Sequence, residues 1–404
     1  MKIGFVSPHT FNSPGGVKKH TLALKKEFES RRHQVKLILP RDTIEESQTL
    51  LYRKKRQNDF FRERDRETIF FGGAFYIPGN ASKTNLSLNI TPLSIWRRLK
   101  KENFDILHFQ NFGVFLPIQI LEVASQLPNL PVKILTLHAL WDASLILQEF
   151  PPIPTLITIF KDYILPKFDG VIGVSRPVLS QIEYKGPQKI IPNGVDLNFF
   201  NPEGEKIEKF SHSNSQIRKN EIINILFVGR IEKRKGLVYL LKAFEILRKR
   251  YQNIRLIVVG EGEKREEMEN FVKQHKILDV FFEGEIQEKN LPKYYRTTDI
   301  CCFPSIYGEA FGIVLLEAMA SAKPIVAFAN QGYKEVLTGK GRDFLVKPKD
   351  VESLVRKLEI LIQSKEKRRE MGRWGREESK KYSWDKIAER TLNFYEEVIR
   401  CKLR

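Results

Sequence analysis

The sequence predicts an α/β protein built from two doubly wound, Rossmann-like domains. Its 404 residues are long for one hydrophobic core, so two domains are expected. Short apolar runs alternate with charged segments of helical length, which is typical of βα units and a mainly parallel sheet. The series of runs stops in one polar stretch and then starts again, so each half is expected to have its own sheet.

Ten apolar runs are the expected strands, at residues 2–6, 34–40, 105–110, 132–138, 170–175, 223–229, 254–260, 279–284, 300–304 and 324–329. The pattern predicts a first domain over residues 1–202, a polar linker over 203–221, a second domain over 222–382 and a C-terminal helix over 383–404. Ligands of such sheets bind at the carboxyl ends of the strands, so we expect a cleft where the two domains face one another.

The chain is strongly basic, with 68 Lys and Arg against 49 Asp and Glu and a net charge of +19. Residues 1–101 alone hold 21 basic and 9 acidic residues. Such a field attracts polyanions, namely nucleic acid, anionic lipid headgroups or nucleotide phosphates. An ordinary solvated surface explains the same excess of basic residues. The net charge therefore limits the candidate partners to these classes but does not decide among them.

Cysteine usage and the absence of apolar segments indicate the compartment. Cys301, Cys302 and Cys401 form neither a disulfide framework nor a metal-ligand spacing, which favours a reducing environment. The first ten residues lack the apolar core of a signal peptide. No run of about 18 apolar residues occurs, so no membrane-spanning helix is expected. We therefore expect a cytoplasmic protein.

The first candidate site follows the first expected strand, where Gly15 and Gly16 precede a charged helix. Backbone N–H groups at a helix start can bind an anion, and glycine lets the anion approach closely. A tight turn that needs a positive φ explains the same pair, and the spacing is not G-x-G-x-x-G. The pair alone therefore leaves both interpretations open.

The second candidate site is the loop that opens the second domain, "GRIEKRKG" at residues 229–236. Arg230 and Lys235 lie there at the carboxyl end of an expected strand. Two such cations can neutralise a diphosphate, with arginine offering a fork and lysine a point charge. An unremarkable pair of surface charges is the alternative.

The strongest signal is "PSIYGEAFGIVLLEAMASAKPIVAF" at residues 304–328. Glu309 lies beside Phe311, Gly312 and Ile313, whose amides are expected at a helix start and can serve an anion or a hydroxyl. A carboxylate there can accept hydrogen bonds from sugar hydroxyls. A simple first-turn charge is the alternative for Glu309, but it leaves Glu317 stranded in an otherwise apolar run.

These motifs together resemble the retaining family-4 glycosyltransferases. Glu309 through Glu317 fits their E-x7-E pattern, and "GRIEKRKG", "IPNGVD" and "VVGEGE" extend the match over nearly the whole chain. "SPHTFNSPGGVKKH", "DILHFQ" and "LTLHA" are most similar to the phosphatidylinositol mannosyltransferase branch. The resemblance implies a GT-B fold, in which the C-terminal helix crosses back to the first domain.

The resemblance also implies a role for each candidate residue. Gly15 and Gly16 would lie against the diphosphate of a nucleotide sugar, and Arg230 and Lys235 would hold it from the other domain. Glu309 and the amides of Phe311, Gly312 and Ile313 would bind the transferred sugar, and Glu317 the ribose. His138 would lie near the anomeric carbon. Without the resemblance, a single histidine at a strand end is interpreted as a structural residue. His108 is expected to be structural.

The implied reaction transfers a hexose, mannose or glucose, with retention of configuration, and GDP-mannose is the donor that the branch suggests. The sequence contains no D-x-D triplet, so we expect no metal cofactor and assign charge neutralisation to Arg230, Lys235 and the helix-start amides. Two alternatives on the same fold are a sugar-nucleotide epimerase and a glycogen-synthase-like transferase. A basic nucleic-acid-binding protein is the rival from another class, although no zinc-ligand or RNP-like pattern occurs and nucleic acid is not expected.

The acceptor side departs from the branch. Gln110–Phe112 and Ala139–Trp141 differ from its pattern, and Gln331-Gly332 replaces a common Gly-Gly. The acceptor is therefore expected to be a lipid or a glycan. Basic and aromatic residues of an apparent insertion suit contact with an anionic membrane at its inner face; they are Arg53, Lys54, Lys55, Arg56, Phe60 and Phe61. A disordered, soluble basic loop is the alternative for this segment.

Overall fold

The computed structural model describes residues 1–11, 15–42, 67–77, 84–88, 91–111, 116–140, 158–210 and 222–403. Its contacts divide the chain into two compact units. The first unit contains Met1–Pro192 and Trp384–Arg404, and the second contains Asn193–Ser383. Residues 193–202, predicted in the first domain, and 203–210, predicted as linker, therefore belong to the second unit.

The first unit is built on a sheet of eight described strands in the order β4-β3-β2-β1-β5-β6-β7-β8. The strands are β1 (Lys2–Val6), β2 (Gln34–Asp42), β3 (Thr68–Ile77), β4 (Thr84–Leu88), β5 (Ile106–Gln110), β6 (Val132–Leu137), β7 (Gly170–Gly173) and β8 (Gln188–Ile190). All neighbouring pairs are parallel except β3 and β4. β1, β5 and β6 are almost wholly buried because helices cover this part of the sheet.

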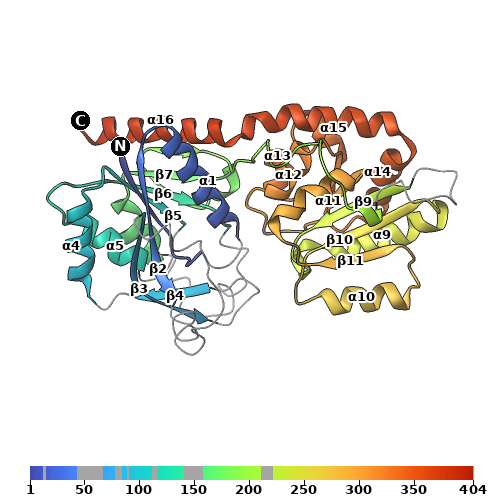
Figure 1. The fold of residues 1–404 in the computed structure, drawn as a ribbon, viewed down its shortest axis with the longest axis horizontal. Helices are drawn as coiled ribbons and strands as arrows, with labels where there is room; N and C mark the ends of the chain where they lie inside the picture. Colours follow the sequence, from blue (N-terminus) through green and yellow to red (C-terminus); the bar gives the residue numbers. More distant parts are fainter. Residues whose placement is uncertain are drawn as a thin grey trace. The chain divides into compact units, whose positions relative to one another are not determined.

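The helices of the first unit come from both ends of the chain. They are α1 (Gly16–Ser30), α4 (Pro92–Glu102), α5 (Leu116–Ala124), a π-helix (Phe160–Ile164), a 3-10 turn (Leu165–Lys167), α8 (Arg176–Leu179) and α16 (Trp384–Lys402). α16 lies beside α1 (Figure 1) and buries Ile387, Phe394 and Val398 in the same cluster as Ile3 and Phe5. The prediction that the C-terminal helix returns to the first domain is confirmed.

The second unit contains a parallel sheet of six strands in the order β11-β10-β9-β12-β13-β14. They are β9 (Ile223–Val228), β10 (Ile254–Val259), β11 (Val280–Gly284), β12 (Ile300–Phe303), β13 (Ile325–Phe328) and β14 (Leu345–Val346). The chain builds outward from β9, first through β10 and then through β12. The space between β9 and β12 is therefore the switch point of a doubly wound sheet, where ligands bind.

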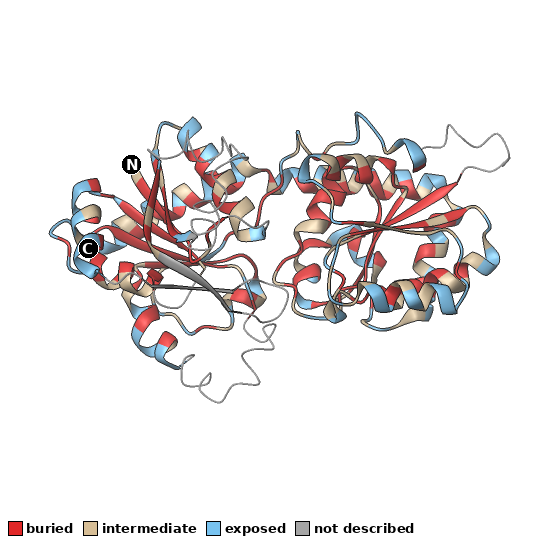
Figure 2. Ribbon diagram, turned by 60° about the horizontal axis from the view of Figure 1, so that its bottom comes forward, coloured by how far each residue is buried: buried red, intermediate tan, exposed pale blue. Residues whose placement is uncertain are grey.

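Helices cover this sheet, with buried residues concentrated along the strands and the inward helix faces (Figure 2). The helices are α9 (Leu237–Arg250), α10 (Arg265–Gln274), α11 (Leu291–Thr297), α12 (Ile313–Ala320), α13 (Gln331–Val336), α14 (Val351–Gln363) and α15 (Lys365–Ser379). Short 3-10 turns lie at Glu208–Phe210, Lys233–Lys235, Glu288–Asn290, Gly339–Phe344 and Lys380–Tyr382. Polar residues define several helix starts: Asp350, Ser364 and Asn330 each accept a hydrogen bond from an N–H of the first turn.

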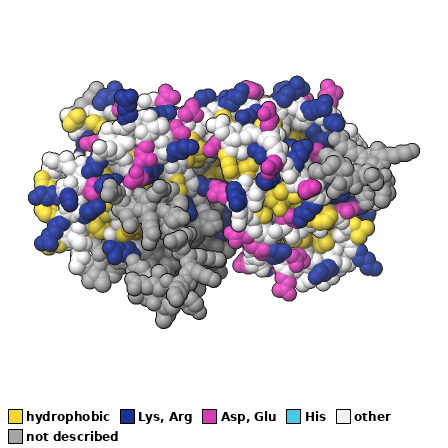
Figure 3. Space-filling view, in the orientation of Figure 1, with side chains coloured by type: hydrophobic (Ala, Val, Ile, Leu, Met, Phe, Trp, Pro, Cys, Tyr) yellow, Lys and Arg dark blue, Asp and Glu magenta, His cyan; other side chains and the backbone are white. Residues whose placement is uncertain are grey.

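The described surface is charged on both units. In the view of Figure 3, Lys and Arg side chains are intermixed with Asp and Glu. Within the described ranges, no helix has both the length and the hydropathy needed to span a bilayer.

Candidate functional site

A well-connected polar cluster lies at the switch point of the second unit. One loop follows β9 and another follows β12, and parallel neighbouring strands end at the same edge of a sheet. The Ile306 N–H donates a hydrogen bond of 2.8 Å to the Arg234 carbonyl and so joins the two loops. A Cβ on Gly236, whose φ is 67°, would lie 2.1 Å from the Pro304 carbonyl oxygen. Glycine is therefore required where the loops meet.

Glu309 is the anionic centre of this cluster. Its Oε1 accepts hydrogen bonds from Lys235 Nζ at 2.6 Å, Ser305 Oγ at 3.0 Å and Arg234 Nη1 at 3.1 Å. Burial raises the pKa of the Glu309 carboxyl, but the charges of Lys235 and Arg234 outweigh burial and leave the pKa below its ordinary value. Glu309 is thus a carboxylate at neutral pH, held by two cations and one hydroxyl.

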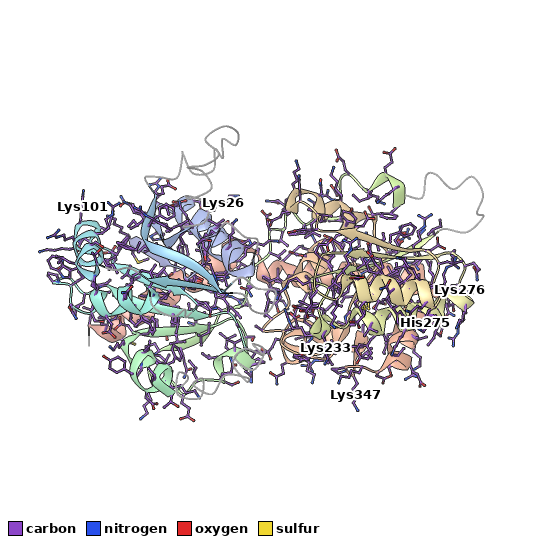
Figure 4. All side chains as sticks on the ribbon, turned by 90° about the horizontal axis from the view of Figure 1, so that it is seen from below. Lys26, Lys101, Lys233, His275, Lys276 and Lys347 are labelled. Carbon is purple, nitrogen blue, oxygen red and sulfur yellow. The ribbon has the colours of Figure 1, made fainter. Side chains whose placement is uncertain are left out.

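The two cations that the sequence predicted to act together contact different carboxylates. Lys235 contacts Glu309, whereas Arg230 is exposed and lies 3.4 Å from Glu232 Oε1. Arg234, which sequence reasoning missed, contacts both carboxylates, with its Nε 2.6 Å from Glu232 Oε1. Its only sequence signal is its place in the basic run 233–235, where the exposed Lys233 also lies (Figure 4).

Backbone groups complete the surroundings of Glu309. Phe311 is buried, Gly312 has a φ of 109°, and Ile313 begins α12. The first N–H groups of a helix have no acceptor within the helix, so the start of α12 can donate to a ligand. A Cβ on Gly332 would lie 2.2 Å from the Glu309 carbonyl oxygen. In the unusual Gln331-Gly332 pair, the second position is therefore the one where packing demands glycine.

Glu317 lies within α12 and is almost fully buried. Its Oε2 accepts a hydrogen bond of 2.9 Å from the Tyr295 hydroxyl. Tyr295 is itself fully buried, and burial together with the Glu317 charge raises the pKa of its hydroxyl well above the ordinary value. The acidic residue in an apolar run therefore has a partner that keeps its proton and donates.

In the first unit, Gly15 and Gly16 lie at the start of α1. Gly15 has a φ of −178° and a ψ of 153°, an extended conformation that any residue adopts. A Cβ on Gly15 would meet no described atom within 4 Å. The interpretation of Gly15 as a tight turn with positive φ is therefore wrong. Gly16 is the first, exposed residue of the helix.

His138 follows β6 and is half-buried. Its Nε2 lies 2.9 Å from Gln110 Oε1, and its ring packs edge-on against His20 of α1, with centroids 4.7 Å apart. His20 is one helical turn beyond Gly16, so α1 joins the glycine pair to His138. Burial, and then the neighbouring His20, His108 and His9, lower the pKa of His138 well below its ordinary value. His138 is neutral at physiological pH.

His108 has the structural environment that we expect of it. It is fully buried, with Nδ1 2.5 Å from the Tyr395 hydroxyl and Nε2 2.6 Å from Thr136 Oγ1. Tyr395 belongs to α16, so His108 connects the sheet to the returning helix.

The predicted residues thus form a group in each unit. Lys235, Glu309 and the start of α12 meet in the second unit, and His138 and the glycine pair are joined through α1 in the first. The predicted membrane-contact residues 53–56, 60 and 61 lie outside the described residues. Over the described ranges, no group of three or more His, Cys, Asp or Glu residues could hold a metal ion.

Comparison with known families matches both units. Residues 14–199 match the model "Glycosyltransferase Family 4", and residues 208–378 match the model "Glycosyl transferases group 1". The chain is 27% identical over 410 residues to the phosphatidyl-myo-inositol mannosyltransferase of Mycobacterium leprae, covering 98% of this chain and 97% of that protein.

Solved structures share the fold. A glycosyltransferase from Rickettsia africae has a TM-score of 0.70 and 19% identity, with 98% of each chain covered. Anabaena HepE in complex with UDP also has a TM-score of 0.70, with 17% identity and coverage of 97% of this chain and 99% of that one.

Proposed function

We propose, since this chain belongs to the family-4 glycosyltransferases and has a GT-B fold of two Rossmann-like domains, that it moves a hexose from a nucleoside diphosphate sugar to an acceptor with retention of configuration. Sugar transfer itself follows from the family. The proposal concerns the finer points: that the sugar is mannose or glucose, which nucleotide carries it, which acceptor receives it, and that its configuration is retained. Neither the epimerase nor the nucleic-acid-binding alternative has better support.

The observation that carries the proposal is the Glu309 cluster at the switch point between β9 and β12. Glu309 is an ionised acceptor that suits the hydroxyls of a sugar, and Lys235 lies against it at 2.6 Å. A lysine in this place can hold a sugar-linked diphosphate from one side while the carboxylate holds the sugar. We assign diphosphate binding to Lys235 and to the exposed fork of Arg230, and sugar binding to Glu309 and the start of α12.

The remaining roles follow from this placement. The transfer step needs stabilisation of the charge that develops on the departing diphosphate, and preorganised cations and amides supply it. Arg234 helps to keep Glu309 ionised. We assign ribose binding to Glu317 and contact with the diphosphate to Gly15 and Gly16. His138 lies near the anomeric carbon. Because these groups neutralise the charge, we propose that transfer needs no metal ion.

We propose a membrane lipid as the acceptor, in line with the named substrate of the mycobacterial relative. α4 supports this proposal. It exposes Arg97, Lys100 and Lys101, the last visible on the outer side of the helix in Figure 4. Leu93 is 56% exposed on the same helix. A helix with exposed cations and an exposed apolar residue suits peripheral contact with an anionic bilayer.

A donor screen tests the proposal directly. GDP-mannose, UDP-glucose and ADP-glucose are compared by thermal shift and by slow hydrolysis without acceptor. We expect one of them to raise the melting temperature of the wild-type chain and of Lys233→Ala, but not of Lys235→Ala. The anomer released first, followed by proton NMR, reports the stereochemistry. A chain that none of these sugar nucleotides stabilises, and that hydrolyses none of them, would contradict the proposal.

A further inference from the structure

We propose that Gln110 is a positioning residue for His138, whose ring it holds in one tautomer and one orientation through its side-chain amide. This inference rests on the proposed function, which places His138 beside the anomeric carbon. Gln110 is the last residue of β5 and is fully buried. β5 and β6 are parallel neighbours, so the end of one lies beside the end of the other.

The hydrogen bonds define the proton positions. Gln110 Oε1 lies 2.9 Å from His138 Nε2, and its amide nitrogen lies 3.3 Å from His108 Nδ1. An amide oxygen only accepts, so His138 carries its proton on Nε2 and keeps Nδ1 as an acceptor. The amide nitrogen only donates, so His108 Nδ1 accepts.

A second layer of hydrogen bonds surrounds His108. With Nδ1 as the acceptor, His108 Nε2 carries the proton and donates to Thr136 Oγ1 at 2.6 Å, and the Tyr395 hydroxyl, 2.5 Å from Nδ1, shares the single Nδ1 lone pair with the more distant Gln110 amide. Because Tyr395 belongs to α16, the returning helix supports His138 through this chain of contacts.

A neutral partner suits the chemistry at this place. Positive charge develops at the anomeric carbon as a glycosidic leaving group departs, and a protonated histidine there would oppose it. A carboxylate in place of the Gln110 amide would favour the charged imidazolium. Among the residues that the structure describes, the titratable groups acting on His138 are His20 of α1, His108 of β5 and His9 of the loop after β1, and they act with burial to keep its pKa low. Gln110 therefore orients the ring without charging it.

Nitrogen-15 NMR of the histidine rings tests the proposal in the free enzyme, with the His138 signals assigned by their loss in His138→Ala. We expect the neutral Nε2–H tautomer between about pH 6 and pH 8. Gln110→Leu should mix the tautomers, and Gln110→Glu should raise the pKa of His138 into this range. Gln126→Ala, a change at an exposed glutamine of the same unit, should alter neither. The proposal would be overturned if neutral His138 carried its proton on Nδ1 in the wild type, or if its tautomer and pKa were the same in both Gln110 variants as in the wild type.

Hydrolysis of the preferred donor separates this proposal from the proposed function. We expect kcat of Gln110→Glu to fall by up to about a hundredfold below the raised pKa and to recover above it, with KM unchanged. Gln110→Leu should lose kcat at every pH. Unchanged kcat in variants whose His138 signals have changed would support the hydrogen bond and overturn the placement of His138 at the reacting carbon. Melting temperatures identify a variant that fails to fold, and the other variant then decides.

Discussion

Tyr295 of α11 donates a hydrogen bond of 2.9 Å to Glu317 Oε2 of α12 in the interior of the second unit. A hydrogen bond to a charged group contributes about 1.5–3 kcal/mol. Tyr295→Phe should therefore lower the melting temperature and, because Glu317 is left without this donor, weaken the binding of the nucleoside diphosphate measured by calorimetry.

The neighbouring Tyr294 provides a matched control. Its hydroxyl donates to Glu283 Oε2 at 2.7 Å, and we assign Glu283 no part in donor binding. Tyr294→Phe should also lower stability but should leave nucleotide affinity at the wild-type value. Equal loss of affinity in both variants would show that the effect is general to α11 and not specific to Glu317.

Glu309→Ala and Lys235→Ala should each nearly abolish transfer while the chain stays folded. Losing one preorganised group at developing charge costs about 2.7–4 kcal/mol in the barrier, or about 10²–10³ in kcat. The exposed Lys233 in the same loop is the control, and Lys233→Ala should turn over as wild type does. Near-native kcat in a folded Glu309 or Lys235 variant would refute the assignment.

Arg234→Gln should change the pH dependence of transfer. Lys235 and Arg234 hold the pKa of Glu309 below its ordinary value against the effect of burial, so the carboxylate stays ionised as the pH falls. Removing Arg234 raises that pKa, and activity that needs the carboxylate should be lost at a higher pH on acidification. Arg230 lies beside Glu232 and not beside Glu309. Arg230→Gln should therefore lower kcat without changing the pH at which activity is lost on acidification. The measurement is kcat/KM against pH for both variants.

Chelation should leave the rate of transfer intact. Arg230, Lys235 and the amides at the start of α12 are expected to neutralise the diphosphate without a divalent ion. The rate of sugar transfer with excess EDTA is compared with the rate in magnesium or manganese. Loss of the activity in chelator, with recovery on adding either metal, would contradict the prediction.

Replacing Arg97, Lys100 and Lys101 of α4 by glutamine should weaken sedimentation with anionic vesicles. Each cation near an anionic surface contributes about 1 kcal/mol, and salt screens this attraction. We expect the wild-type chain to bind at low salt and the variant to show both weaker binding and a flatter dependence on salt. Neutral replacement of residues 53–56 should act in the same direction.

Three exposed lysines of the second unit serve as the charge-matched control for that experiment, namely Lys273, Lys276 and Lys347, the last two visible in Figure 4. Their replacement by glutamine should leave vesicle binding intact. If the wild-type chain does not bind anionic vesicles at low salt, a soluble glycan becomes the better-supported acceptor.

Ten of the fourteen described strands could be predicted from the sequence because their signals are local, whereas β3, β4, β8 and β14 were not predicted. Apolar runs mark buried strands, and the motifs after β9 and β12 lie at carboxyl ends that a doubly wound sheet brings together. The partner of His138 could not be predicted in this way. Gln110 meets it only through the pairing of β5 with β6, and no local pattern in the sequence specifies such a contact.

Arg234 and the domain boundary were missed for similar reasons. The 3-10 turn at Lys233–Lys235 directs Lys235 and Arg234 to Glu309 and leaves Lys233 exposed, a choice that three consecutive basic residues do not reveal. Residues 193–202 belong to the second unit in part because the Arg376 guanidinium donates to the carbonyls of Leu197, Phe200 and Ala320. Leu197 and Arg376 lie near opposite ends of the second unit in the sequence, so no local pattern indicates their contact.

The return of α16 to the first unit determines the order in which the chain can finish folding. Residues Asn193–Ser383 form one continuous segment and can reach their native contacts as soon as they are synthesised. The first unit, although most of it is made earlier, lacks Phe394 and Val398 of its core until the second unit has left the ribosome. The amino-terminal unit is therefore the last to be completed, and a nascent chain that stalls before α16 exposes the apolar surface that this helix covers.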